Sequence, residues 1–164
     1  MQQLIIRPAT IADLPRLMQI FAIARQRMAE MGNPHQWTDG YPDEQILRAN
    51  ITAGDCLAIE QQGRVVAVFT LHAGIDPTYA HIYHGAWLND APYATIHRIA
   101  SSGEASGIMH VAMHYARQRH ANIRIDTHED NAVMRHALAN EGFRYCGIIH
   151  CRDGSDRLAY QWSV

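Results

Sequence analysis

Cysteine, charge and long apolar runs are scarce in this sequence. The three cysteines, Cys56, Cys146 and Cys151, are irregularly spaced among 164 residues, which argues against a disulfide framework and for a reducing compartment. Charged residues make up only 18% and the formal net charge is -2, so no basic field recruits nucleic acid. No apolar run approaches the roughly 20 residues of a membrane-spanning helix, and the start, MQQLIIRPAT, lacks a signal-peptide pattern. We therefore expect a cytoplasmic protein with neither a nucleic-acid nor a membrane partner.

What is present suits an ordinary globular protein. Apolar residues make up 48% of the chain, which predicts one domain with a full core over residues 1–164. Histidine is unusually frequent, with 11 residues, and His110 and His114 lie four apart in an expected helix. No HExxH pattern or further ligand set accompanies them. We therefore expect no metal, and a histidine-based metal hydrolase stays a hypothesis that metal analysis tests.

The spacing of apolar residues predicts alternating strands and helices without repeats or linkers. Apolar residues at helical spacing predict helices at 14–28, 43–53, 107–120 and 131–140. Alternating runs bounded by turn residues predict strands at 4–7, 56–61, 64–72, 81–87, 95–100, 123–127, 143–151 and 157–162. This order is typical of one mixed α/β sheet with helices on both faces.

The most informative segment is Thr95–Tyr115, TIHRIASSGEASGIMHVAMHY. The alternating run Thr95–Ala100 predicts a strand, and the small residues of Ser101–Gly107 predict a loop that leads directly into a helix. The backbone N–H groups of such a loop and the partial positive charge of the helix start favour an anion. The segment therefore predicts a diphosphate site, without the lysine of a Walker pattern.

Three further patterns belong together: IRPAT at Ile6–Thr10, HRIASSGEASG at His97–Gly107, and IRIDTHEDNAVM with NEGFRYCGI between Ile123 and Ile148. The last of these places Asn131 after a strand and Gly142–Phe143 after a helix. Over essentially the whole chain these motifs and the element order resemble the GNAT acetyltransferase superfamily. The resemblance implies an α/β (α+β) acyl-CoA N-acyltransferase fold, with a single mixed, mostly antiparallel sheet and helices on both faces.

The same resemblance implies the reaction. It implies an N-acetyltransferase that moves an acetyl group from acetyl-CoA to a primary amine of a small molecule, amino acid or peptide, by direct attack in a ternary complex. The alternative is a non-catalytic module of the same fold that binds or senses acyl-CoA. Ser106, Met109 and Leu138 motivate this alternative because they depart from the superfamily's pattern. The expected oligomeric state is a monomer or a homodimer.

In the superfamily the pyrophosphate of coenzyme A lies on the loop before the third helix, which the resemblance carries onto Ser102–Met109. Gly107 matches the first glycine of the pattern Arg/Gln-x-x-Gly-x-Gly/Ala, whereas Met109 stands at the second glycine and Ser106 where a basic residue is common. Glu104 repels a diphosphate unless it turns to solvent. Asn131 either holds the pantetheine arm or caps the following helix. The implied cofactor-binding residues are Ile99, Ser101, Ser102, Gly103, Ser106, Gly107, Ile108, Met109, Asn131 and Met134.

The catalytic groups that the resemblance implies are less specific. The oxyanion donor is a backbone N–H that maps near Ile99. Many relatives carry a tyrosine acid four residues before the glycine of Gly–Phe, and this chain has Leu138 there. His128, His97 and Tyr145 are therefore the candidate proton donors or acceptors, with packing, structural hydrogen bonding or proton transfer through ordered water as the alternatives.

Two aromatic residues occur in the polar segment Asn33–Pro42. In the superfamily this loop between the first two helices shapes the acceptor pocket, so Trp37 and Tyr41 are candidate substrate-binding residues. The alternative for Trp37 is that it fills the edge of the core. Nothing in the sequence identifies the amine.

Overall fold

The computed structural model describes residues 3–164 and contains one seven-stranded sheet. The strand order is β1-β2-β3-β4-β5-β7-β6. Neighbouring strands are antiparallel, except that β4 and β5 are parallel. The strands are β1 (Leu4–Pro8), β2 (Cys56–Gln61), β3 (Arg64–Ala73), β4 (Ala94–Ser101), β5 (Asn122–Thr127), β6 (Arg144–His150) and β7 (Asp156–Ser163). The predicted mixed, mostly antiparallel sheet is therefore confirmed.

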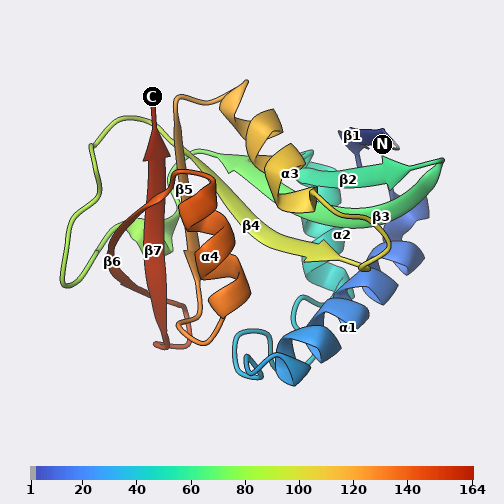
Figure 1. Cartoon of the computed structure of the whole chain (residues 1–164), viewed down its shortest axis with the longest axis horizontal. Helices are drawn as coiled ribbons and strands as arrows, with labels where there is room; N and C mark the ends of the chain where they lie inside the picture. The colour runs from blue at the N-terminus through green and yellow to red at the C-terminus, as the bar shows by residue number, and fades with distance from the viewer. Residues whose placement is uncertain (1–2) are drawn as a thin grey trace.

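Helices cover both faces of this sheet (Figure 1). They are α1 (Leu14–Glu30), α2 (Glu44–Ala53), α3 (Ile108–Arg117) and α4 (Ala132–Asn140), with short 3-10 helices η1 (Ile11–Asp13) and η2 (Pro77–Tyr79). In Figure 1, α3 and α4 lie in front of the sheet, and α1 and α2 belong to its other side. None of these helices, within the described part of the chain, is long and apolar enough to cross a membrane.

Each face of the sheet has its own apolar core. Under α3 and α4, buried residues such as Ile96, Met113 and Leu138 form one cluster. Under α1 and α2, residues such as Leu17 and Phe21 form a second cluster. Because strand side chains alternate between faces, the residues next to Ile96 on β4 and next to Ile125 on β5 project from the face opposite the first cluster.

The β4–β5 pair is joined over a very short length. Only Ala94 with Ile123 and Thr95 with Arg124 are paired. Beyond these pairs the two strands separate, and Figure 1 shows β4 turning away from β5 toward α1. Backbone groups of the following half of β4 therefore face an open seam instead of a neighbouring strand.

A β-bulge lies on β4 where the seam opens. Val68 pairs with Ala100 and Thr70 pairs with His97, so two residues of β4 oppose one residue of β3. The first of the two, Arg98, has φ +52°. A bulge of this kind bends its strand and re-aims the residues around it, which gives β4 its local turn at the seam.

The sequence-based elements agree with the structure within a few residues, with one exception. The strand expected at 81–87 is wrong. Only Tyr83 is paired, through two 2.8 Å backbone hydrogen bonds with Ile148. His84 has φ +56°, and a Cβ at Gly85 would lie 1.9 Å from the carbonyl oxygen of Cys146. The segment therefore crosses the edge of β6 closely, but the reversed backbone at His84 stops it from continuing as a strand.

Candidate functional site

A cavity of about 690 Å³ lies at the seam. It is lined by β4 from Ile96 to Ser101, the first turns of α3 and α4, and the segment between α1 and α2. These four elements come from separate parts of the chain, and their ends meet where β4 separates from β5. Of the sequence-predicted cofactor residues, the cavity lining includes Ile99, Ser101, Ile108, Met109, Asn131 and Met134.

The remaining predicted cofactor residues lie in the adjoining loop, whose first part is held by its own hydrogen bonds. Ser102 donates its N–H and its hydroxyl to the carbonyl of Val66, at 2.9 and 3.1 Å. The N–H of Gly103 donates to Ser101 Oγ, and that of Glu104 donates to Ser102 Oγ. The hydroxyl hydrogen of Ser102 is thus used within the fold, whereas Ser106 Oγ has no partner within residues 3–164.

The second part of the loop presents a run of unpaired donors. From Ala105 to His110, six consecutive backbone N–H groups have no hydrogen-bond acceptor in the described chain, and the first paired one belongs to Val111. Gly107 permits this path, since its φ of +77° lies in the left-handed region that favours glycine. Met109, at the position of the second glycine in the family pattern, packs its side chain against the α3–α4 core. The run coincides with the start of α3, where the helix dipole adds partial positive charge.

The acidic residue of this loop is neutralised by arginines. Glu104 accepts from Arg16, and its other carboxylate oxygen lies 2.9 Å from Arg64 Nε. A further cation, Arg27 of α1, lies against Gly103, where an added Cβ would stand 2.1 Å from the Arg27 Nη1 atom. Arg27 lines the cavity and makes no ion pair or hydrogen bond through its side chain within the described residues. Three arginines thus surround the loop against one glutamate, so the local net charge is positive.

The three candidate proton-transfer residues lie in different places. His97 lines the cavity, while His128 and Tyr145 do not. The N–H of Asp130 donates to His128 Nδ1 at 3.0 Å, and Tyr145 is 53% exposed on β6, with its ring edge against Tyr160. Leu138, which stands where relatives carry a tyrosine, is fully buried in the core.

His97 has a carboxylate partner that sequence reasoning missed. The imidazole Nε2 lies 2.7 Å from Oδ2 of Asp76, which also lines the cavity. Asp76 Oδ1 accepts from the N–H and hydroxyl of Thr78, at 2.9 and 2.7 Å. Burial alone would raise the pKa of Asp76, but the hydrogen bonds from His97 and Thr78 outweigh it and hold this pKa well below its usual value. The carboxylate is therefore ionised throughout the neutral pH range.

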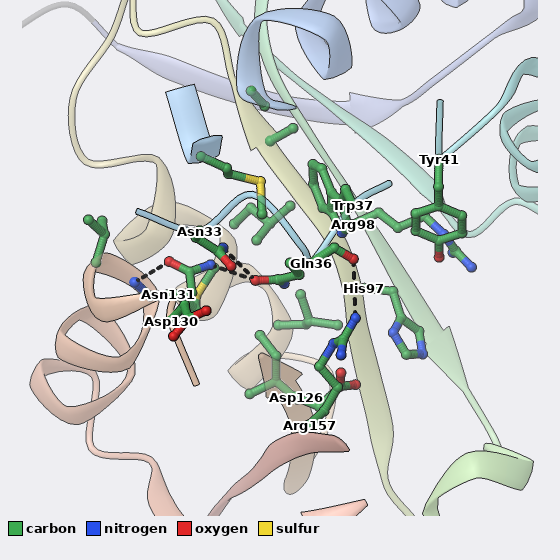
Figure 2. Close-up of a pocket in the computed structure, with 18 of the residues that line it drawn as sticks. Asn33, Gln36, Trp37, Tyr41, His97, Arg98, Asp126, Asp130, Asn131 and Arg157 are labelled. Carbon is green, nitrogen blue, oxygen red and sulfur yellow. Dashed lines mark hydrogen bonds between the residues drawn. The ribbon is translucent and has the colours of Figure 1, made fainter. Parts of the chain in front are cut away.

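Asn131 caps α4 and also meets the α1–α2 segment. Its Oδ1 accepts from the N–H of Met134 at 3.1 Å, which satisfies one of the free donors at the helix start. Its Nδ2 donates to Gln36 Oε1 at 2.9 Å, and the carbonyl of Gln36 accepts from Arg157 (Figure 2). The expected capping role is present, and one amide hydrogen of Asn131 is left for a ligand.

The two aromatic residues of the α1–α2 segment, Trp37 and Tyr41, make different contacts. Trp37 packs its ring edge against Phe21, with centroids 5.6 Å apart, as the packing alternative expected. It also lines the cavity, so its contact with a substrate stays a prediction. Tyr41 also lines the cavity, where it is exposed and accepts a 2.9 Å hydrogen bond from Arg98 Nε, while Arg98 Nη1 donates to Asn50. Figure 2 shows Tyr41 and Arg98 beside one another at the side of β4. The bulged arginine thus ties the α1–α2 segment and α2 to β4.

Metal-ligand geometry is not found here. No group of three or more histidine, cysteine or acidic side chains suited to hold a metal ion occurs among residues 3–164. His110 and His114 stack at 6.4 Å on α3, and His110 pairs with Glu141. The four-residue spacing therefore reflects a helix surface.

Comparisons with known proteins identify the fold. No protein-family model and no curated protein matches the sequence. The structure is similar to that of an acetyltransferase of the GNAT family from Streptococcus agalactiae, with 31% identity, coverage of 100% of this chain and 98% of that chain, and a TM-score of 0.87. A GNAT-family acetyltransferase from Listeria monocytogenes has 19% identity, coverage of 98% and 95%, and a TM-score of 0.73.

A third solved structure is the ribosomal-protein-alanine N-acetyltransferase from Brucella melitensis, with 21% identity, coverage of 98% and 99%, and a TM-score of 0.61. The two more distant likenesses show the fold. The Streptococcus protein shows more, because its identity extends over the complete length of this chain. The resemblance inferred from the sequence is confirmed: the chain belongs to the GNAT family of acetyltransferases.

Proposed function

We propose that the protein is an N-acetyltransferase that moves the acetyl group of acetyl-CoA to a primary amine of a small molecule, amino acid or peptide. The observation that carries the proposal is the run of unpaired N–H groups from Ala105 to His110. Six adjacent donors at a helix start suit the two phosphates of coenzyme A. Bound there, acetyl-CoA supplies an activated acetyl group as a thioester.

The seam suits the remaining part of the same molecule. The pantetheine arm is extended and carries amide groups, and β4 beyond Thr95 has no strand on its β5 side. Backbone groups of Ile99 and Ser101 are our proposed partners for this arm, with Met109 and Met134 as apolar walls. Asn131 contributes its second amide hydrogen. The N–H of Ile99, beside the bulge, is our proposed donor to the thioester oxygen as negative charge develops on it.

The other end of the cavity suits an amine. Asp76 and Asp126 lie in its wall, and both carboxylates attract a protonated amine before it is deprotonated for attack. Trp37 adds an apolar surface to the same cavity. These features favour a cationic acceptor and do not select one amine.

The first experiment measures binding and turnover separately. Titration calorimetry with coenzyme A and acetyl-CoA tests the cradle, and release of free thiol from acetyl-CoA with a panel of amines tests transfer. The chain contains no lysine, so its own side chains add no acetylated lysine to the product analysis. We expect both binding and amine-dependent thiol release.

The experiment also separates the alternative function. Binding of coenzyme A without thiol release for any amine would favour the acyl-CoA-binding module, for which the buried Leu138 in place of a tyrosine acid is the structural argument. An absence of binding at millimolar coenzyme A would overturn the transferase and the binding module together.

A further inference from the structure

His97 is the one of the three sequence-predicted proton-transfer residues that reaches the cavity, and its two ring nitrogens have different surroundings. Nε2 is 2.7 Å from the Asp76 carboxylate. Nδ1 has no hydrogen-bond partner among residues 3–164. A neutral ring that donates its Nε2 hydrogen to an ionised carboxylate keeps a lone pair on Nδ1. The arrangement therefore leaves one nitrogen free to accept a proton.

Both carboxylate oxygens and the backbone N–H of Asp76 are held by hydrogen bonds. Thr78 binds one carboxylate oxygen with two hydrogen bonds, and His97 binds the other. The backbone N–H of Asp76 donates to the hydroxyl of Tyr93 at 2.9 Å. With its side chain only 14% exposed, Asp76 has little freedom to rotate, so the ring that it binds is held in one orientation and one tautomer.

The strand places this ring where the acceptor amine is expected. Ile96 belongs to the α3–α4 core, so by alternation His97 projects from the opposite face, the side of the α1–α2 segment. Ile99 is separated from His97 by the single bulged residue Arg98, and both line the cavity. That separation suits a base that deprotonates an amine as the amine attacks a carbonyl held at Ile99.

Other titratable groups surround the pair. The Tyr79 ring centroid lies 6.1 Å from that of His97, and the Tyr79 hydroxyl donates to Asp126 of β5 at 2.6 Å. Burial is the largest cause that raises the pKa of Tyr79 well above its usual value, and the charge of Asp126 adds to it, so Tyr79 stays neutral. Arg98 of β4 and Arg157 of β7 also line the cavity, each bonded elsewhere.

We propose that His97 is the general base of the acetyl transfer, with Nδ1 as the accepting atom and Asp76 as its positioning residue. This inference rests on the proposed function. The ammonium group of the acceptor gives one proton to Nδ1. Its nitrogen lone pair then forms the C–N bond to the thioester carbon, the C–S bond breaks, and the second nitrogen proton goes to the departing sulfur. The imidazolium returns its proton to solvent, which balances the step.

The chain supplies a matched control pair. His72 of β3 lies 2.8 Å from Asp55 through Nδ1, in a histidine–carboxylate pair like that of His97. Neither residue lines the cavity. His72→Gln therefore removes a paired imidazole of the same kind from a place where no reaction is proposed.

The test compares His97→Gln, Asp76→Asn and His72→Gln with the unmodified protein, using the amine that gives the fastest thiol release. General-base catalysis contributes about 10²–10⁴-fold, so we expect His97→Gln to lower kcat by at least about 100-fold with an unchanged affinity for coenzyme A. The limb of the kcat/KM profile in the range where imidazoles titrate, about pH 5–8, should vanish. Asp76→Asn should also lower kcat, with an unchanged affinity for coenzyme A, because the ring loses the carboxylate that holds its orientation and tautomer. His72→Gln should keep both the rate and the limb.

A second measurement reads the ring directly. Nitrogen-15 NMR of the imidazoles should show His97 as the Nε2–H tautomer, and Asp76→Asn should alter that signal without altering the one from His72. A ring protonated on Nδ1 in the neutral form would overturn the inference. So would a His97→Gln variant that keeps the rate and the pH limb while the unmodified protein transfers acetyl groups. If the unmodified protein binds coenzyme A and transfers nothing, the proposed function fails first and the base assignment fails with it.

Discussion

Gln36 Oε1 and Asn131 Nδ2 are joined by a 2.9 Å hydrogen bond across 95 positions of sequence. The same oxygen lies within hydrogen-bond distance of Asn33 Nδ2, at 2.9 Å, and of Thr127 Oγ1, at 3.3 Å. One amide oxygen thereby links the α1–α2 segment to the end of β5 and to the start of α4. The two sides of the seam are connected through this residue.

Gln36→Ala should destabilise the protein and loosen this connection. The side-chain donors of Asn33 and Asn131 lose their acceptor, and for the buried Asn33 an unsatisfied donor costs about 1–3 kcal/mol. We expect a lower urea midpoint and faster amide hydrogen exchange at the N–H of His128, which lies 3.4 Å from the same oxygen. Gln36→Glu keeps an acceptor at this position and should retain most of the stability. Equal stability of both variants would contradict the linking role.

Gly107→Ala tests the cradle through backbone conformation alone. The position has φ +77° and open space around an added Cβ, so the substitution introduces strain of about 1–2 kcal/mol and no clash. Gly63 in the β2–β3 turn has φ +75° and equally open space, which makes Gly63→Ala a matched control. Both variants should lose similar stability in thermal unfolding, but only Gly107→Ala should weaken coenzyme A binding in calorimetry. Unchanged affinity in Gly107→Ala would argue against the cradle.

Arg27→Gln should weaken coenzyme A binding several-fold, because it removes the cation next to Gly103. The loss should shrink as salt rises, since ions screen an exposed charge over about 10 Å at 0.1 M. Arg48→Gln is the control, as Arg48 pairs with Glu44 on the surface of α2 and does not line the cavity. Titrations at two salt concentrations measure the effect. Arg27→Lys retains the charge and should bind more tightly than Arg27→Gln; if it binds no better, charge is not the cause.

The ionised Asp13 carboxylate should stabilise the fold near neutral pH and lose this contribution at low pH. Hydrogen bonds from Arg7 are the largest cause that lowers its pKa from 3.8 to about 2, and its side chain is 12% exposed. Because the folded-state pKa is depressed, the contribution is complete above about pH 4 and is lost as pH falls through about 2. Asp13→Asn should therefore cost about 1–2 kcal/mol in urea unfolding at pH 7 and almost nothing near pH 2. Glu44→Gln, in an exposed pair, should change little at either pH.

Local patterns predicted most of the secondary structure. Alternation located the β2–β3 hairpin, helical spacing located α1 and α4, and the small-residue run located the loop before α3. These signals act over a few residues, so the sequence carries them directly. The strand expected at 81–87 is wrong because only Tyr83 forms a bridge there, and the positive φ of His84 ends the extended backbone.

The partners within the site were beyond local patterns. Asp76 lies 21 positions before His97, in a segment whose residues indicate a turn. The local role of its carboxylate is to cap the N-terminus of η2, which gives no sign of a contact with His97. Arg27 belongs to the last turn of α1 and reads as an ordinary helix-surface cation. Such pairs arise when the sheet brings distant segments together, and no spacing rule within one element reveals them. Asn131 is the exception, since its capping position is a local signal.

The two residue pairs that join β4 to β5 have a mechanical consequence. The four strands before the seam and the three after it share few backbone bonds, so side-chain packing in the core under α3 and α4 carries most of the connection between them. An extended ligand that forms hydrogen bonds with the free edges of both β4 and β5 would connect the two groups of strands. A ligand bound in the seam should therefore raise the force needed to separate β4 from β5, although the protein itself is unchanged.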